Sequence, residues 1–341
     1  LVMRTTDDAR AVPVTCPSAQ AAATYRWILS REAGEREEGE FQPSMLEITG
    51  SKPIDDGTYQ RGLLRLPCPL PGYHQLTVCK PDGAEISMAL IIVPVTSYQP
   101  AALADGGRIY GPALQLYGVR SQRNWGIGDF TDLRLMVELA GESGMDIIGL
   151  NPLHTLFPGN PAHISPYSPS SRLFLNIMYM DVEAVADFAE CEEARTMVAD
   201  ESFQARLRAL RSEELVDYPQ ITAAKLTLLA QLYQHFRKQH LQVDSERAKQ
   251  FRVFQAEGGD ALRRHALFEA LQAHFQGQDA GIWGWPVWPE AYRNPAAPVV
   301  TAFAQDHVEE LEYYEYLQWL ADQQLDAAGK ASLTFGLGVG L

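Results

Sequence analysis

The sequence has few of the features that mark membrane, secreted or nucleic-acid-binding proteins. Its four cysteines form no CxxC pair and have no His at zinc-finger spacing, which disfavours a structural zinc site and favours reduced thiols. No apolar run reaches about 18 residues, and the amino terminus lacks a secretory-signal pattern. Lys and Arg number 28 against 43 Asp and Glu, a net charge of -15 that disfavours phosphate-rich partners. We therefore expect a cytoplasmic protein without nucleic-acid or membrane partners.

Short apolar segments alternate with turn residues in the first hundred positions. The turn signals are Asp55-Asp56-Gly57, Pro71-Gly72 and Lys80-Pro81-Asp82-Gly83. Strands at this spacing predict a β-sandwich domain over residues 1–100. Small residues with Pro100, Gly106 and Gly107 then indicate a linker, so a second domain is expected from residue 101.

The second domain begins with a strand, helix and strand pattern. Residues 113–119 can form a strand, and residues 145–150 form a second apolar strand. Between them, residues 131–143 place an apolar face on a helix, made of Leu133, Met136, Val137 and Ala140. This βαβ unit predicts parallel strands in a sheet that is either covered on both faces or closed into a barrel. The pattern alone does not separate these two possibilities.

Helical periodicity dominates the remainder of the chain. It predicts a helical insertion at about residues 182–300, with apolar faces that include Phe203, Leu207 and Leu210. A long helix over residues 300–328 then leads to a strand-like run at 331–338. About three strands of an eight-stranded barrel are visible before Leu341, so we expect a fragment of a longer protein.

A loop rich in proline, serine and tyrosine follows the strand at 145–150. It reads Ser165-Pro166-Tyr167-Ser168-Pro169-Ser170-Ser171-Arg172. In a (β/α)8 barrel, the loops after the carboxyl ends of the strands build the substrate site. Core formation explains poorly a tyrosine between two prolines in a polar loop, so Tyr167 is expected to contact a ligand.

Other candidates have structural alternatives. Asp129 could be a catalytic carboxylate, but it lies where an aspartate caps a helix, and we prefer capping. The Gly126-x-Gly128 pair lacks the third glycine and the preceding strand of a dinucleotide site. His154 and His163 follow the second strand but have no metalloprotease spacing, so we prefer a solvent or hydrogen-bonding role.

Two further motifs also have structural alternatives. Gly336-x-Gly338-x-Gly340 reaches Leu341 where a dinucleotide fingerprint has glycine, and it indicates close backbone approach instead. The run Trp283-Gly284-Trp285-Pro286-Val287-Trp288-Pro289-Glu290-Ala291-Tyr292-Arg293 is the densest aromatic stretch. Aromatic faces can stack on sugar rings, but packing of an irregular loop is the preferred interpretation.

Several of these motifs resemble the amylomaltases, the 4-alpha-glucanotransferases or disproportionating enzymes of glycoside hydrolase family 77. The matching segments fall in family order: residues 125–130, 149–154, 165–172, 175–181 and 316–319. The resemblance is strong over residues 107–341, and the first hundred residues match the β-sandwich of the longer members. It implies a multidomain protein, with a sandwich followed by the first part of a (β/α)8 TIM barrel with helical insertions, an incomplete barrel over residues 101–341.

The resemblance also implies an activity. Family members cut an α-1,4-glucan and transfer the glycosyl piece to another maltooligosaccharide or to glucose, by retaining double displacement and without a cofactor. Tyr167 matches the family's tyrosine beside the scissile subsite, and Ser165 is a weaker sugar-contact candidate. The family's three catalytic carboxylates lie on later strands, so no residue of this chain inherits a catalytic role and the chain alone is expected to be inactive. No metal site is expected.

Two alternatives remain open. The chain could belong to a non-catalytic α-glucan-binding module, in which the sandwich and the tryptophan run bind sugar. It could also belong to a related α-glucan hydrolase that uses water as the acceptor. The oligomeric state, the glucan chain-length preference and the role of the first domain are left open by the sequence.

Overall fold

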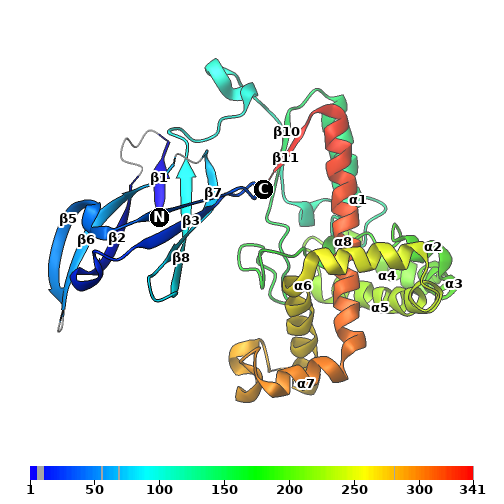
Figure 1. The fold of residues 1–341 in the computed structure, drawn as a ribbon. Coiled ribbons are helices and arrows are strands. Elements are labelled where there is room, and N and C mark those ends of the chain that lie inside the picture. The colour runs from blue at the N-terminus through cyan, green and yellow to red at the C-terminus, as the bar shows by residue number, and fades with distance from the viewer. Residues whose placement is uncertain (6–10, 55–56, 68–69, 280, 341) are drawn as a thin grey trace. The chain divides into compact units, whose positions relative to one another are not determined.

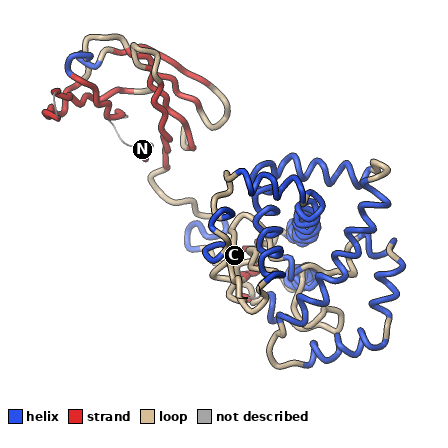
Figure 2. Tube along the Cα trace, turned by 90° about the horizontal axis from the view of Figure 1, so that it is seen from below, coloured by secondary structure: helices blue, strands red, loops and turns tan. Residues whose placement is uncertain are grey.

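The chain divides into two compact units, residues 1–106 and residues 107–341 (Figure 1). The computed structural model describes residues 1–5, 11–54, 57–67, 70–279 and 281–340. The expected turn at Asp55-Asp56, the thiol of Cys68 and the terminal Leu341 lie outside the described residues. Figure 2 shows that strands make up most of the first unit and that helices dominate the second.

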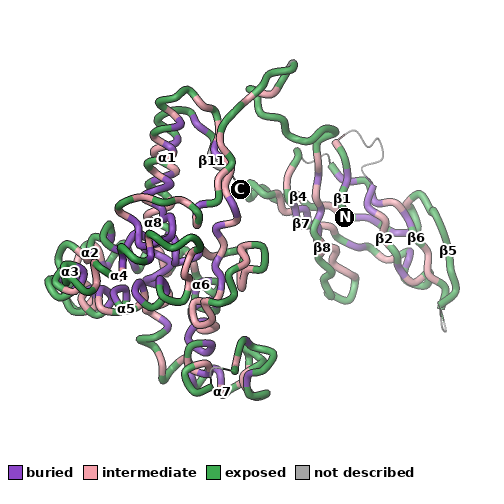
Figure 3. The backbone as a smooth tube through the Cα atoms, turned by 180° about the vertical axis from the view of Figure 1, so that it is seen from behind, coloured by how far each residue is buried: buried purple, intermediate pink, exposed green. Residues whose placement is uncertain are grey.

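The first unit is a β-sandwich, as predicted. One sheet has the order β1-β8-β7-β3-β4 and the other β2-β6-β5; β1 runs parallel to β8 and the other pairs are antiparallel. The bounds are β1 Val2–Arg4, β2 Ala11–Pro17, β3 Tyr25–Ser30, β4 Arg36–Phe41, β5 Glu47–Ile54, β6 Gly57–Arg65, β7 Gly72–Cys79 and β8 Glu85–Val93. Side chains from both sheets, among them Val12, Leu29, Leu64, Leu76 and Leu90, form one core. Buried and exposed residues alternate along several of these strands, as expected for a sheet with one buried face (Figure 3).

The second unit contains a small parallel sheet of order β11-β10-β9. Its strands are β9 Ala113–Leu114, β10 Ile147–Leu150 and β11 Gly338–Gly340. Helix α1, Phe130–Glu142, connects β9 to β10, which confirms the predicted βαβ unit, and Leu133, Val137 and Ala140 are buried on its inner face. Strands consecutive in the chain are neighbours in the sheet, the arrangement with which a (β/α)8 barrel begins.

Helices connect β10 to β11. They are α2 Ala186–Glu190, α3 Glu192–Ala199, α4 Glu201–Ser212, α5 Tyr218–Phe236, α6 Glu246–Gln278, α7 Pro298–Asp306 and α8 Val308–Phe335. The predicted apolar faces of α4 and α5 are packed in the large core of this unit. Helix α6 is broken at Gly259, whose φ of 49° and ψ of -138° are not helical, so its second half begins at Asp260. Helix α8 packs along both α1 and α6 (Figure 1).

Three predicted elements differ from the structure. The strand expected at 113–119 ends at Leu114, because the chain turns into a 3-10 helix at Leu116–Gly118. The helix expected at 300–328 is two helices, α7 and α8, separated at His307. The strand expected at 331–338 is wrong: α8 continues to Phe335, Gly336 ends it in the left-handed region, and only residues 338–340 are extended.

Candidate functional site

The loops after β9 and β10 leave the same edge of the parallel sheet, and Asn151 joins them. This buried asparagine is the first residue after β10. Its Oδ1 accepts a hydrogen bond from the Leu116 backbone amide at 2.7 Å, and its Nδ2 donates to the Pro152 carbonyl at 2.8 Å and to the Tyr179 hydroxyl at 3.0 Å. The side chain therefore satisfies a backbone donor of one loop while it fixes the start of the other.

The loop over residues 151–176 has an ordered base. Backbone hydrogen bonds join Thr155 to Phe174 and Asn176 to Leu153, each at 2.8 Å. The amide side chain of Gln318, on α8, bonds both the N–H and the C=O of Leu175 at 2.9 Å. The two ends of the loop are therefore held to each other and to α8.

The predicted substrate residues lie at this tip. Tyr167 is 70% exposed, and Ser165 is half-buried in the turn closed by the Ser168 amide and the Ser165 carbonyl at 3.1 Å. Among the described residues, no hydrogen bond or ring contact engages the Tyr167 side chain. A large ring presented to solvent by a fixed loop is available to a ligand, while its contact with substrate stays a prediction.

Asp129 caps a helix, which confirms the preferred interpretation. Its carboxylate accepts from the Asp132 amide at 2.9 Å, and the Asp132 carboxylate accepts from the Asp129 amide at 3.2 Å, a reciprocal capping box at the start of α1. The Arg123 guanidinium donates to the carboxylates of Asp129, Asp132 and Asp181. Burial raises the pKa of Asp129, although its hydrogen bond with Arg123 opposes that shift. The Asp129 carboxylate is therefore already bonded to the Asp132 amide and to the Arg123 guanidinium.

Lys225, which the motifs did not indicate, joins α5 to the segment that follows the loop over residues 151–176. This lysine of α5 is 1% exposed, and its Nζ donates to the carbonyls of Met178 and Met180, both at 2.6 Å. Burial lowers its pKa to about 8, while the nearby carboxylates of Asp129 and Asp181 act in the opposite direction. A charged residue on an otherwise apolar helical face, with Leu228, Leu229 and Leu232, was the signal that could have identified it.

The remaining candidates have structural roles or none that the structure shows. Gly128 approaches the Leu116 carbonyl so closely that a Cβ would lie 2.1 Å from its oxygen, which supports packing over dinucleotide binding. The His154 backbone forms a bridge with Leu175, and the His163 ring lies 4.7 Å from that of Phe157. Across the described part of the chain, no group of three or more His, Cys, Asp or Glu has the arrangement of a metal site.

The tryptophan run divides into buried and exposed members. Trp288 is 3% exposed, and its Nε1 donates to Gln272 of α6 at 3.0 Å, so packing describes this residue correctly. Trp283 and Trp285 are each 55% exposed. Trp285 lies at the start of a 3-10 helix, Trp285–Val287, beside a cavity along α6. The sequence pattern alone did not separate these roles.

Within the described residues, no helix is long and apolar enough to cross a membrane.

Comparisons with known proteins match parts of both units of the chain. A family model described as 4-alpha-glucanotransferase matches residues 114–340, and one described as the MalQ N-terminal beta sandwich domain matches residues 1–94. The 4-alpha-glucanotransferase of Haemophilus influenzae is 35% identical over 283 residues, which cover 82% of this chain and 40% of that protein. The 4-alpha-glucanotransferase of Mycobacterium tuberculosis is 32% identical over 290 residues, 81% of this chain and 37% of that protein.

Two solved structures of amylomaltases share the fold of this chain. The crystal structure of amylomaltase from Corynebacterium glutamicum superposes with a TM-score of 0.74 at 25% identity, covering 99% of this chain and 44% of that one. An amylomaltase from Streptococcus agalactiae in complex with acarbose matches 68% of this chain and 43% of that one, with a TM-score of 0.52 at 18% identity. This chain spans about 40% of the Haemophilus relative's length. With the family model matched over most of its second unit, the chain belongs to the 4-alpha-glucanotransferases of glycoside hydrolase family 77.

Proposed function

We propose that this chain is the amino-terminal part of an enzyme that transfers α-1,4-glucan segments between maltooligosaccharides or from them to glucose. The observation that carries the proposal is the family match over residues 114–340, which includes both loops at the carboxyl edge of the parallel sheet. We further propose that the sheet is the first part of a (β/α)8 barrel and that the protein is cytoplasmic. The free thiols of Cys16, Cys79 and Cys191 favour that location.

The chemistry is a double displacement with retention. It requires two carboxyl groups about 5 Å apart, one as the nucleophile that forms a glycosyl-enzyme and one as the acid and then the base. In this chain Asp129 and Asp132 form the capping box of α1, and both share Arg123 with Asp181. As the resemblance to the family implies, we propose that the reacting carboxylates belong to barrel strands later than β11, and that this chain supplies substrate contacts and no catalytic residue.

Tyr167 is the proposed principal contact, with Ser165 beside it. The Tyr167 ring is 70% exposed at the tip of a loop whose base is fixed on β10 and α8. Its flat face can cover the C–H side of a glucose ring, and its hydroxyl can bond a sugar hydroxyl. Such a contact holds the donor glucan in place and helps to exclude water, so that a sugar hydroxyl becomes the acceptor.

The test uses the full-length enzyme with maltotriose and sizes the products. Glucose together with maltooligosaccharides longer than maltotriose supports transfer, whereas products that are all shorter indicate a hydrolase, and no product indicates a binding module. Tyr167→Ala is expected to lower kcat/KM by about five- to 150-fold, the equivalent of losing about 1 to 3 kcal/mol of transition-state binding.

Two further variants make the result specific. Tyr167→Phe retains the ring and separates stacking from hydrogen bonding by the hydroxyl. Tyr73→Ala is the matched control, because Tyr73 is 71% exposed on β7 of the sandwich. Transfer kinetics unchanged in Tyr167→Ala, or lowered equally in Tyr73→Ala, would remove the basis for the assigned contact.

A further inference from the structure

A cavity of about 450 Å³ lies between the two sheets of the sandwich. Apolar side chains of both sheets line it, with Val12 and Val14 of β2 in one sheet, and Leu76 of β7 and Met88 of β8 in the other. The inner side chains of two packed sheets normally interdigitate and leave few voids larger than a water molecule. A space of this size is instead in the range of small-molecule binding sites.

The cavity lies beside an open edge of each sheet. Strand β2 is an edge strand, and β8 pairs with β1 only at residues 91–93. Within the described part of the sandwich, residues 85–88 of β8 therefore have a strand neighbour on one side only. Ile86, in this part of β8, lines the cavity and is 58% exposed, so the cavity reaches the solvent there.

One lining residue is a buried tyrosine whose hydroxyl has a weak partner. Tyr25 is 4% exposed, and its ring packs against that of Phe41 with 5.6 Å between centroids. The hydrogen bond described for its hydroxyl goes to Gln20 Oε1 at 3.4 Å, longer than the usual distance of about 2.7 to 2.8 Å. Because buried hydroxyls normally have a well-formed hydrogen bond, a polar ligand atom in the cavity would supply a better partner.

Among the described residues that line the cavity, Lys80 alone is cationic. Its backbone is fixed in the turn between β7 and β8, where its N–H donates to the Ala84 carbonyl at 2.8 Å and its carbonyl accepts from the Gly83 amide at 3.0 Å. No hydrogen bond or ion pair within the described part of the chain engages its ammonium group. Asp82, the lining residue of opposite charge, already accepts from the Ala84 amide at 3.0 Å. The Lys80 charge is therefore available to an anionic group of a ligand.

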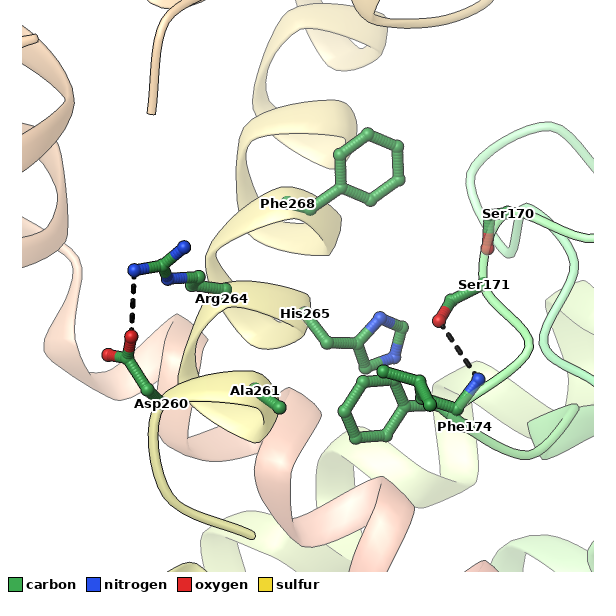
Figure 4. Close-up of a pocket in the computed structure, with 9 residues that line it drawn as sticks. Ser170, Ser171, Phe174, Asp260, Ala261, Arg264, His265 and Phe268 are labelled. Carbon is green, nitrogen blue, oxygen red and sulfur yellow. Dashed lines mark hydrogen bonds and ion pairs between the residues drawn. The ribbon is translucent and has the colours of Figure 1, made fainter. Parts of the chain in front are cut away.

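A cavity of the second unit, along the second half of α6, differs in this respect. There Arg264 pairs with Asp260 at 2.7 Å, and the His265 ring stacks on that of Phe174 (Figure 4). The arginine charge is already offset within that cavity. The sandwich cavity instead combines an apolar lining with a cation that lacks a partner.

We propose that this cavity binds a small monocarboxylate with an aliphatic chain. The chain lies against the apolar lining of both sheets, and the carboxylate accepts from Lys80, with the Tyr25 hydroxyl as a second donor. A ligand with several negative charges fits less well, because Asp82 also lines the cavity and the chain has a net charge of -15. The inference does not depend on the function proposed for the second unit.

The experiment titrates the chain with octanoate in a calorimeter and compares octanol, which has the same aliphatic length and no charge. Saturable binding of both is expected, because the cavity takes up the aliphatic part. Lys80→Gln is expected to raise the Kd of octanoate by about two- to fivefold, the range of a partly exposed ion pair, and to leave that of octanol unchanged. Lys52→Gln is the matched control, because Lys52 is an exposed lysine of β5 that does not line the cavity.

Two further variants locate the site. Val14→Phe places a larger side chain in the cavity and is expected to abolish binding of both ligands. Tyr25→Phe removes the hydroxyl but keeps the ring, and it is expected to raise the Kd of octanoate by about two- to tenfold, the effect of one lost hydrogen bond. Thermal unfolding of each variant identifies a folding defect.

Three results would overturn the inference. They are the absence of saturable heat with octanoate at millimolar concentration, a Kd that Lys80→Gln and Lys52→Gln raise equally, and binding that a folded Val14→Phe leaves unchanged. If Val14→Phe does not fold, the comparison of octanoate with octanol in Lys80→Gln decides the question, because loss of the carboxylate partner affects octanoate alone.

Discussion

Glu269, on α6, is a carboxyl group placed where ionisation is costly. Its side chain is 3% exposed, and its Oε1 has no hydrogen-bond partner among the described residues. Burial raises its pKa to about 8, from an ordinary value of 4.5, and the carboxylate in turn raises the pKa of Tyr314, whose main cause is burial. The folded protein therefore keeps Glu269 protonated at neutral pH, whereas the unfolded chain does not.

This difference predicts a pH dependence of stability. Since the folded chain retains the Glu269 proton between pH 4.5 and 8, the free energy of unfolding falls as pH rises through that window, by at most about 1.4 kcal/mol per pH unit. Burial lowers the pKa of His265 from 6.5 to about 4, so this residue makes the free energy of unfolding rise with pH between those two values. From pH 6.5 to 8, Glu269→Gln should therefore flatten the decline in urea-unfolding midpoint. The exposed Glu257→Gln is the control, and an unchanged slope in Glu269→Gln would contradict the assignment.

At the scale of elements, the N-caps of α1 and α4 differ in burial. Asp129 and Asp200 are both aspartate N-caps, of α1 and α4, but Asp129 is buried and also pairs with Arg123, whereas Asp200 is exposed. Asp200→Ala should cost only the small loss that follows the removal of an exposed cap. Asp129→Ala should cost about 2 to 4 kcal/mol, because it also leaves a charged guanidinium with one partner fewer. Chemical unfolding of the two variants side by side measures the difference, and equal losses would show that the Arg123 contact adds nothing.

Local periodicity predicted those elements whose buried faces repeat at a single spacing. The sandwich strands follow from turn residues, and α1, α4 and α5 follow from apolar residues three and four positions apart. The run at 331–338 was misassigned because its composition suits a strand, while tertiary packing extends α8 through it. Phe335 packs on α1 at Gly141, where an added Cβ would lie 2.3 Å from the Phe335 ring. Such a contact between distant segments has no local signature.

The same reasoning separates what could be predicted of the candidate site from what could not. The exposure of Tyr167 was predictable, because core formation explains poorly a tyrosine between prolines in a polar loop, while its contact with substrate stays a prediction. The Asp129 cap was identifiable from its place before an apolar helix. By contrast, the contacts of Asn151 with Leu116 and Tyr179, and of Lys225 with Met178 and Met180, join residues 28 to 47 positions apart. Only the fold brings these partners together.

At the scale of the whole molecule, each unit has its own hydrophobic core. The core of the sandwich is built from residues between Met3 and Ile92, and the large core of the second unit from residues between Leu116 and Leu337. No residue that the structure describes belongs to both cores. Because burial of apolar surface is the main stabilising contribution to folding, each unit is expected to unfold as a cooperative unit of its own.

A matched pair of core variants tests this expectation. Leu29 of β3 and Leu229 of α5 are both 0% exposed, so replacing either with alanine should cost about 2 to 5 kcal/mol in its own unit. Calorimetry of the chain should show two unfolding transitions, with Leu29→Ala lowering one midpoint and Leu229→Ala the other. A single transition that both variants shift equally would show that the two cores are energetically coupled. Transitions that shift separately would mean that the sandwich does not hold the second unit folded.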